Sequence, residues 1–401
     1  MSPLLSSLFS LFLICVINSK VITNKSLRHQ LPFTHAVHPE ATLPFIDYCN
    51  YFSYPVESHR VTTQDGYILT LNRIQRKYSS ISPNLPVVLL MHGLLDSSDG
   101  AVINDESKSP AFMLANLGYD VWSGNARGNK YSRSHVKYDP DNDREFWDFS
   151  WDDIAAYDLP VFFDYVTKAT GQQKIDYMGH SQGTTVMFAA LADKNPVVTQ
   201  HLGKFIALGP VAYVFHQSSK PMQILSDSRL LDLLNYLNLD EFSPSDWLQK
   251  SVGKIICAQF GNICVDLLGS FSDADPSRDN MERADVFVGH FPSGTSLKNV
   301  YKWQQEILVD AFQKFDYGAE ENLRRYGQTV PPPYNLGNIE HKVYLFSASE
   351  DLLSNPTDVQ RLKDELKDAE LKIYPKMGHL TFMVGQDMSF MNDVILALQE
   401  K

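Results

Sequence analysis

The sequence predicts an α/β fold whose doubly wound, mostly parallel sheet carries an inserted helical cap. Runs rich in Val, Ile, Leu and aromatic residues, typical of buried parallel strands, alternate with segments whose apolar residues recur at helical spacing. This alternation stops after Tyr213 for about 120 residues of mostly helical sequence and then resumes. The 401 residues, 44% of them hydrophobic, are sufficient for one large core with such an insertion. Alternating strands and helices indicate a sheet with helices on both faces.

Four strands are expected before the insertion. They cover Pro86–Gly93, Tyr119–Asn125, Lys174–His180 and Lys204–Tyr213. Helices are expected between them at SPAFMLANLG (109–118), WDDIAAYDLPVFFDYVTKATG (151–171) and TTVMFAALADK (184–194). Proline lacks an N–H and clashes with the preceding helical turn, so Pro160 should kink or restart the second helix. We assign 45–214 to the first part of the core.

The pattern resumes near the C-terminus. It predicts a strand at His341–Asp351, a helix at 356–369, a strand at Leu371–His379 and a C-terminal helix ending at Lys401. The second part of the core is therefore 336–401. The helical cap, 215–335, follows a strand and is expected just above the carboxyl edge of the sheet.

An uncharged apolar run from Leu4 to Val16 lies near the N-terminus and is followed by Asn18 and Ser19. A short apolar run that leads to a small residue is typical of a secretory signal peptide, which we assign to 1–19. The alternative is a membrane anchor, but a helix needs about 20 apolar residues to span a bilayer and this run is shorter. No later segment is apolar enough to span. The protein is expected to be secreted or lysosomal.

The formal net charge is -12 and the pI is about 5.4. An acidic chain without a basic stripe or a nucleic-acid motif has little to offer a phosphate backbone, so nucleic acid is not expected as a partner. We expect no metal ion and no cofactor. The pattern makes no prediction of the oligomeric state.

Four cysteines are present, and Cys15 lies in the predicted signal peptide. Cys257 and Cys264 in ICAQFGNIC are a candidate disulfide that would close a short loop and leave Cys49 unpaired. The alternative is two buried thiols, seven residues apart, on one face of a helix. The sequon NKS makes Asn24 a candidate glycosylation site.

The stretch IDYMGHSQGTT places Ser181 between a predicted strand and a predicted helix. Its centre, Gly179-His180-Ser181-Gln182-Gly183, has the form G-x-S-x-G of a nucleophile elbow, a sharp turn that lifts a serine hydroxyl above the sheet edge. Side chains at Gly179 and Gly183 would clash with the crowded backbone. The alternative is an ordinary glycine-rich turn, but the strand before it and the helix after it favour the elbow.

A serine nucleophile needs a base to take its proton and an acid to orient that base. His379 follows the last predicted strand and is the candidate base. His341 precedes a strand and His290 lies in the insertion, so both are weaker candidates. Asp351 and Glu350 follow the preceding strand, and the residue pattern alone does not choose between these two acids.

A serine nucleophile also needs two hydrogen-bond donors for the oxyanion that develops on the group it attacks. Such folds take one donor from the backbone N–H after the nucleophile, here Gln182, and one from the loop after an early strand. Leu94 in MHGLLDSS is the candidate for the second donor. The alternative is that HGLL is a strand-ending turn with a structural histidine.

From about Phe45 to the C-terminus, the chain resembles the acid lipase family, which includes gastric lipase, lysosomal acid lipase and sterol esterases. The resemblance rests on ordered segments, among them HGLLDSS, LANLGYDVWSGNARGNKYS, FWDFSWDDIAAYDLP, YMGHSQGTT, FPSGTSLKNVYKWQQ and DLLSNPTDV. It implies an α/β-hydrolase core with a cap and lid. It further implies hydrolysis of triacylglycerols or cholesteryl esters at acid pH and identifies Asp351 as the triad acid. The chain departs from the family pattern in the closer spacing of Cys257 and Cys264 and in its single sequon.

Long acyl chains need an apolar tunnel, which a soluble protein keeps covered in water. We expect 241–271 to be a lid that opens at a lipid–water interface and makes a transient contact with the lipid surface. The alternative is a plain core helix of the cap. Two other functions are alternatives to a lipase. One is a serine esterase, thioesterase or peptidase that acts on smaller substrates, and the other is a lipid-binding protein without catalysis.

Overall fold

The computed structural model describes residues 38–82, 84–225, 231–232, 236, 240–242 and 272–400. The predicted signal peptide and Asn24 lie outside the described residues. So do Cys257, Cys264 and the predicted lid, except for its first two residues. The only cysteine among the described residues is Cys49, a free and buried thiol.

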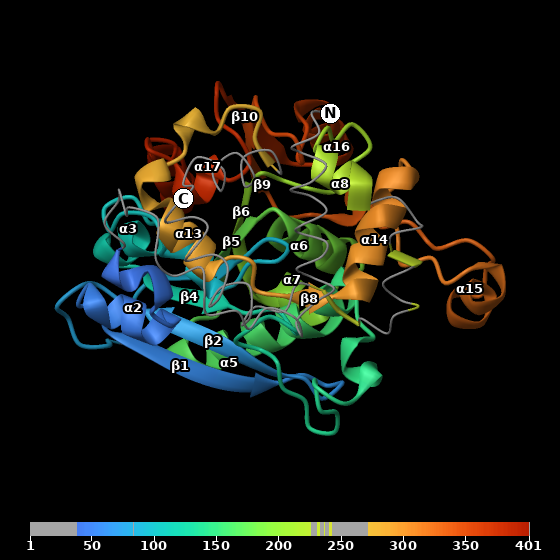
Figure 1. Ribbon diagram of the computed structural model, residues 1–401, viewed down its shortest axis with the longest axis horizontal. Coiled ribbons are helices and arrows are strands. Elements are labelled where there is room, and N and C mark those ends of the chain that lie inside the picture. The colour runs from blue at the N-terminus through green and yellow to red at the C-terminus, as the bar shows by residue number, and fades with distance from the viewer. Residues whose placement is uncertain are drawn as a thin grey trace, which may run out of the picture.

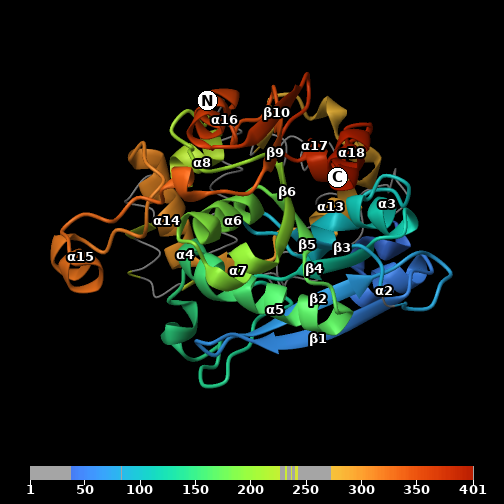
Figure 2. The same cartoon turned by 180° about the vertical axis from the view of Figure 1, so that it is seen from behind.

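The core is one eight-stranded sheet in the order β1-β2-β4-β3-β5-β6-β9-β10 (Figures 1 and 2). All neighbours from β4 to β10 run parallel, whereas β1 pairs with β2 and β2 with β4 in antiparallel register. The predicted doubly wound, mostly parallel sheet is therefore confirmed. The strands of this sheet are β1 Val56–Thr62, β2 Ile68–Ile74, β3 Val87–Met91, β4 Asp120–Gly124, β5 Ile175–His180, β6 Leu202–Leu208, β9 Val343–Ala348 and β10 Ala369–Tyr374.

Helices cover both faces of the sheet, as the alternating sequence predicts (Figure 2). Strand β3 shows why its sequence VVLLM has no polar face: Val87, Leu89 and Met91 join one core cluster, and Val88 and Leu90 join the other. The helices are α2 Phe45–Tyr51, α3 Pro110–Asn116, α4 Trp151–Asp153, α5 Leu159–Thr170, α6 Gln182–Ala192, α7 Pro196–His201, α16 Pro356–Glu365, α17 Thr381–Val384 and α18 Met391–Gln399.

The predicted effect of Pro160 is visible between α4 and α5. A π-helical turn at Ile154–Asp158 separates the two, and α5 restarts at Leu159 with proline in its first turn. The wider π-helical turn, in which the Leu159 N–H donates to the Ile154 carbonyl, accommodates the proline that lacks an N–H at the next position.

The described part of 215–335 carries helices beside the sheet (Figure 1). A short antiparallel pair, β7 and β8, joins residues on either side of the part of the insertion that is not described. The elements of the insertion are α8 Lys220–Leu225, β7 Glu241–Phe242, α13 Ala284–His290, β8 Thr295–Ser296, α14 Leu297–Leu308 and α15 Ala319–Tyr326.

Several predicted strands are longer than the observed ones. The strand expected to continue to Tyr213 ends at Leu208, since Gly209 takes a positive φ of 53° and turns the chain. The strand expected at Leu371–His379 ends at Tyr374. The residues beyond these two strand ends form the loops that carry the candidate site.

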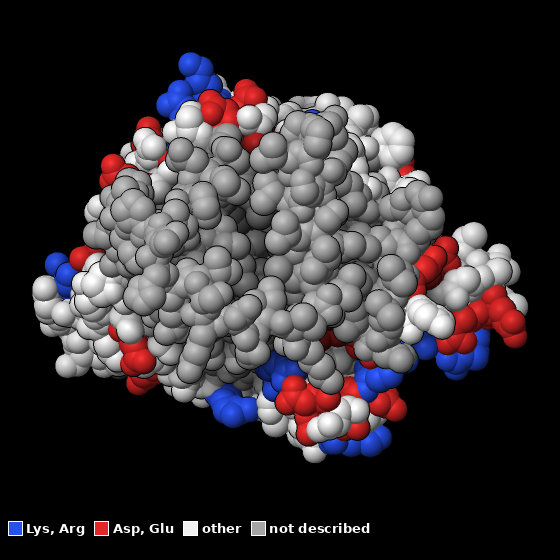
Figure 3. All heavy atoms as spheres, in the orientation of Figure 1, with Lys and Arg blue, Asp and Glu red and all other residues white. Residues whose placement is uncertain are grey.

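Charged side chains of both signs are interspersed on the described part of the face shown in Figure 3. On α15, for example, Glu321 pairs with both Arg324 and Arg325. This face shows no continuous basic stripe among the described residues, which agrees with the acidic net charge. Among the same residues, no helix combines the length and the apolar character that a membrane crossing requires.

Candidate active site

Ser181 occupies the turn between β5 and α6. Its backbone has φ 53° and ψ -122°, a conformation that residues other than glycine seldom adopt. Its N–H donates a hydrogen bond to the Leu208 carbonyl at the end of β6, 3.0 Å away, and its carbonyl accepts from the Thr184 N–H at 2.7 Å. The side chain is half-buried. The turn thus has the geometry of a nucleophile elbow, in which a strained residue is maintained by the elements around it.

The two glycines of the elbow have no room for a side chain. A Cβ on Gly179 would lie 2.7 Å from the Gly183 carbonyl carbon. A Cβ on Gly183 would lie 2.3 Å from the Met91 carbonyl oxygen on β3. Both obstacles are backbone atoms, which cannot rotate away. The close approach of α6 to β3 and β5 therefore requires glycine at both positions.

We expect Gly183→Ala to lower the free energy of unfolding by about 3 kcal/mol, because the new methyl group must displace the backbone of a central strand. The matched control is Gly318→Ala, at a glycine with φ 85° and open space around it. That control should cost only the strain of a positive φ, about 1 kcal/mol. Chemical denaturation measures both variants, and equal losses would show that the contact with Met91 is tolerated.

His379 and Asp351 face each other across the loops that follow β10 and β9. His379 Nδ1 donates to Asp351 Oδ2 at 2.7 Å, and both side chains are buried. The other carboxylate oxygen, Oδ1, accepts from the N–H groups of Leu353 and Ser354 at 2.8 and 2.7 Å. With its proton on Nδ1, the imidazole presents Nε2 as an acceptor, and this buried atom has no partner among the described residues. An unoccupied basic nitrogen is what a serine base requires.

The remaining candidates from the sequence lie elsewhere. The Glu350 side chain is partly exposed and contacts the Ser349 hydroxyl instead of a histidine. His290 bonds to Asp99, and His341 precedes β9 at the opposite end of that strand. Of the two acids that the residue pattern left open, Asp351 is the one that contacts His379.

Gly209, which the sequence reasoning did not single out, makes room for this pair. A Cβ at this position would lie 3.0 Å from His379 Nδ1 and 3.6 Å from Asp351 Oδ2. The Gly209 N–H donates to the Phe346 carbonyl at 2.9 Å, so the backbone is held in place. A signal was available, because Gly209 and Pro210 interrupt the apolar run that was predicted as one strand, Lys204–Tyr213.

The loop after β3 approaches the nucleophile closely. A Cβ on Gly93 would lie 3.0 Å from Ser181 Cβ. The Gly93 carbonyl is turned toward His92 Nδ1 at 2.8 Å and toward the Asp96 N–H at 3.3 Å. The following peptide bond is trans, so the Leu94 N–H points the opposite way from that carbonyl. This arrangement leaves Leu94 available as an oxyanion donor.

His92 holds this orientation as a neutral imidazole. Its Nε2 accepts from the Ala126 N–H at 3.1 Å and from Asn129 Nδ2 at 3.2 Å, so its proton resides on Nδ1 and is donated to Gly93. Burial lowers the pKa of His92 to about 4. Unlike an exposed histidine, His92 therefore keeps this hydrogen-bond pattern in mildly acidic medium.

The second candidate donor, Gln182, is the first residue of α6, where the backbone N–H has no partner within the helix. Its side chain is buried, and Oε1 accepts from Asn299 Nδ2 at 2.9 Å and from Trp303 Nε1 at 2.8 Å. Both partners lie on α14. The elbow is thus connected to a helix of the insertion by two buried hydrogen bonds.

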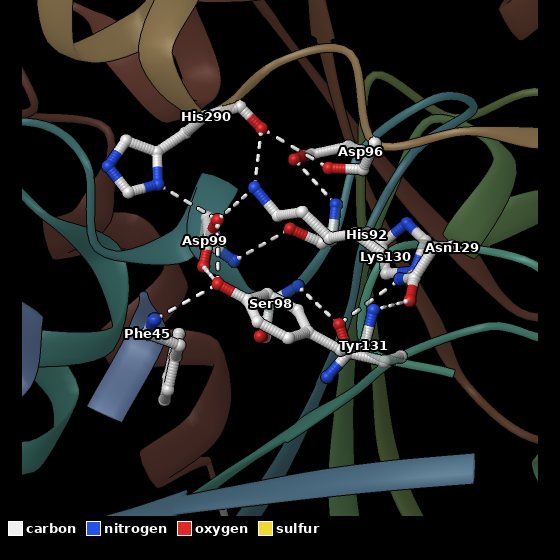
Figure 4. A network of polar contacts seen from close by, with 12 residues as sticks. Phe45, His92, Asp96, Ser98, Asp99, Asn129, Lys130, Tyr131 and His290 are labelled. Atoms are coloured by element: carbon white, nitrogen blue, oxygen red, sulfur yellow. Dashed lines mark hydrogen bonds and ion pairs between the residues drawn. The ribbon is translucent and has the colours of Figure 1, made fainter. Parts of the chain in front are cut away.

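A buried ionic network centred on Asp99 anchors the chain segment that follows β3 (Figure 4). The Asp99 carboxylate contacts Lys130 Nζ at 2.6 Å and His290 Nδ1 at 2.9 Å, and accepts from the Tyr131 hydroxyl at 2.9 Å. Burial would raise the pKa of Asp99, but the attraction of Lys130 and His290 outweighs it and holds the pKa well below its ordinary value. The Leu95 carbonyl accepts from the Ser293 N–H at 2.7 Å, which joins this loop to the insertion.

His180 connects the elbow to the loop that follows β10 and carries His379, here called the histidine loop. Its Nε2 donates to the His379 carbonyl at 3.0 Å, and the two rings lie 4.9 Å apart. Burial, with a contribution from His379, lowers the pKa of His180 to about 3. His180 is therefore neutral and serves as a fixed hydrogen-bond donor.

Comparison with known proteins identifies the family of this chain. Residues 86–386 match the family model described as alpha/beta hydrolase fold, and 45–105 match the one described as partial alpha/beta-hydrolase lipase region. Gastric triacylglycerol lipase of Bos taurus is 36% identical over 373 residues, which cover 91% of this chain and 93% of that protein. Lysosomal acid lipase/cholesteryl ester hydrolase of Homo sapiens is 37% identical over 364 residues, which cover 88% and 89%.

Among solved structures, a soluble variant of monoglyceride lipase from Saccharomyces cerevisiae, in complex with a substrate analog, superimposes with a TM-score of 0.53. It covers 92% of this chain and 98% of its own at 14% identity, a likeness that concerns the fold alone. The extensive identity to the lipases confirms the resemblance noted in the sequence: the chain belongs to the acid lipase family of α/β hydrolases.

Proposed function

We propose that the protein is an acid lipase that hydrolyses the ester bonds of triacylglycerols or cholesteryl esters through an acyl-enzyme on Ser181. As a member of its family it is a carboxylic ester hydrolase. The observation that carries the proposal is the bonded pair of His379 and Asp351, which leaves a free basic nitrogen in the same site as a serine elbow. A lipid-binding protein without catalysis would have no use for this arrangement.

In the first half-reaction, Ser181 Oγ attacks the ester carbonyl carbon while its proton moves to His379 Nε2. The Asp351 carboxylate stabilises the imidazolium. The backbone N–H groups of Leu94 and Gln182 donate to the oxyanion. Collapse of the tetrahedral intermediate transfers the proton from Nε2 to the departing alcohol and leaves the acyl group on Ser181.

In the second half-reaction, water attacks the acyl group and gives its proton to His379 Nε2. That proton returns to Ser181 Oγ as the fatty acid leaves, which restores the enzyme. We assign this chemistry to the core, 45–214 and 336–401, and propose that the helical cap, 215–335, covers the acyl-binding side of the site.

We also propose that the protein acts outside the cytoplasm, in a secreted or lysosomal setting. The names of its gastric and lysosomal relatives support this proposal. The signal peptide predicted at 1–19 points the same way. A lipid ester at a lipid–water interface is the expected partner.

The proposed substrate class is tested with purified protein on emulsified trioleoylglycerol, cholesteryl oleate, a phospholipid and a short p-nitrophenyl ester, across about pH 4 to pH 8. We expect hydrolysis of at least one of the first two lipids, at a rate that Ser181→Ala abolishes. Hydrolysis of the short ester alone, with both long-chain lipids intact, would overturn the lipase assignment and favour a small-ester esterase.

A further inference from the structure

Two buried carboxyl groups contact the loops that carry Asp351 and His379 but do not belong to the candidate triad. They are Asp273 and Asp279, whose residues are 2% and 3% exposed. Both come from the part of the insertion that precedes α13. Acidic side chains are rarely buried this completely unless a partner compensates them. Neither has an ion-pair partner among the described residues, so their contacts require another explanation.

Asp273 contacts the loops of both the acid and the base. Its backbone forms an antiparallel bridge with Asp351, flanked by hydrogen bonds from Ala274 N–H to the Glu350 carbonyl at 3.0 Å and from Leu352 N–H to the Ser272 carbonyl at 2.9 Å. Its Oδ1 accepts from the N–H of Leu380, next to His379, at 3.2 Å. Asp273 therefore connects the two loops whose relative position determines the hydrogen bond between His379 and Asp351.

Asp279 holds the same histidine loop from its other side. Its Oδ1 accepts from the Thr381 hydroxyl at 2.8 Å, and the oxygen of that hydroxyl accepts from the Gly378 N–H at 3.0 Å. Its backbone forms a bridge with Gly385. Asp273 and Asp279 together thus bind the residues immediately before and after His379.

The contact between the two carboxyl groups requires a proton. Asp273 Oδ2 is buried and finds no donor among the described residues, so an ionised Asp273 would leave it without a hydrogen bond. A protonated Asp273 instead donates to Asp279. Burial raises the pKa of both groups, and for Asp273 the charges of Asp279 and Asp351 raise it further; the pKa of Asp279 rises to about 6. The pair therefore retains a proton in mildly acidic medium.

We propose that Asp273 and Asp279 share one proton and that this proton positions the His379 loop, so that its loss in alkaline medium lowers the reactivity of Ser181. The proposal rests on the proposed function in assigning His379 as the base. Asp273 and Asp279 touch no substrate atom. They are positioning residues that act through the backbone around the base.

The direction of the effect follows from the charges that face the pair. Asp351 acts on Asp273, and the exposed Asp275, close to Arg278 and Lys376, acts on Asp279. His379 is next to Leu380, whose N–H donates to Asp273. Loss of the shared proton places a second negative charge beside the buried Asp351 carboxylate. The repulsion is relieved when 272–274 separates from the two catalytic loops.

The sign of the stability change follows from the same pKa shifts. A carboxyl group whose pKa is raised on folding contributes stability in acid and loses it as the pH rises through the folded-state pKa. The stability contributed by Asp279 should therefore fall as the pH rises from its ordinary pKa of 3.8 to about 6. Ser181 reactivity should fall at higher pH, where Asp273 loses the shared proton.

The test measures the rate at which a fluorophosphonate labels Ser181 in the full chain at about pH 5.5 and about pH 8.5, a readout that does not depend on the lipid. Asp273→Asn keeps an oxygen for the Leu380 N–H and an N–H for Asp279 but cannot ionise. We expect the ratio of the alkaline rate to the acid rate to rise severalfold over that of the unmodified chain, because the variant keeps both loop contacts in alkaline medium.

The matched control is Asp275→Asn, which removes a negative charge two residues away and should change the ratio far less, because this charge is exposed to solvent. A wild-type ratio in folded Asp273→Asn overturns the proposal, as does an equal rise in the control. If Ser181 is labelled but trioleoylglycerol and cholesteryl oleate stay intact, the substrate class is wrong and the proton pair is still tested. If Ser181 is unreactive at both pH values, the proposed function and this inference fall together.

Discussion

Replacement of Ser181 or His379 by alanine is expected to lower turnover by about 10⁶, with either change costing nearly as much as both together. The serine hydroxyl is a poor nucleophile until His379 Nε2 takes its proton. This nitrogen is available for that step because it has no hydrogen-bond partner among the described residues. The two groups act as one unit. Their losses should therefore not add.

The measurement is the steady-state rate on an emulsified ester for both single variants and the double variant. His341→Ala is the control, since that histidine precedes β9 at the far end of the strand. More than a few per cent of residual activity in Ser181→Ala would end the assignment of the nucleophile. Additive losses in the double variant would show that the two side chains act independently.

Asp351→Asn is expected to lower turnover by about 10⁴ while the fold is preserved. The N–H groups of Leu353 and Ser354 hold one oxygen of this side chain, so an asparagine must place its oxygen there and turn its NH₂ toward His379. The NH₂ can only face an imidazole whose Nδ1 is an acceptor. The histidine proton then moves to Nε2, where it blocks proton transfer from Ser181.

Glu350→Gln is the matched control for this change, because it neutralises the adjacent acid and should leave turnover within about twofold. Two-dimensional NMR of the imidazole nitrogens checks the cause directly, since the proton should lie on Nδ1 in the unmodified protein and on Nε2 in the variant. A larger loss from Glu350→Gln than from Asp351→Asn would transfer the role of the acid to Glu350.

The sequence predicts the parallel part of the sheet well, because these strands are buried on both faces and their apolar runs have no competing interpretation. It does not identify the hairpin of β1 and β2. Strand β1, VESHRVT, lies at the edge of the sheet and has polar residues. Strand β2 includes the buried Arg73, which pairs with Asp120 on β4 at 2.7 Å and with Glu57 on β1 at 3.0 Å. A cross-strand partner of this kind cannot be read from local periodicity.

The residues of the candidate site divide in the same way, into those that the local sequence predicts and those that depend on contacts distant in the chain. Ser181 and His379 could be predicted because the fold delivers chain segments to the carboxyl edge right after a strand, and those positions are visible in the pattern. The residue pattern left Asp351 and Glu350 open, and the family resemblance identified Asp351. The structure adds a physical reason, because two N–H groups hold the Asp351 carboxylate toward His379. Asp273 escaped notice because nothing in its own segment shows that it lies beside Asp351 and Leu380.

The most direct test of a serine acyl-enzyme in this protein is peptide mapping by mass spectrometry after treatment with a fluorophosphonate. We predict one modified residue, Ser181, with the adduct lost in Ser181→Ala and strongly slowed in His379→Ala. An active enzyme that carries the adduct on another serine, or that remains unmodified while its ester hydrolysis continues, would contradict the account.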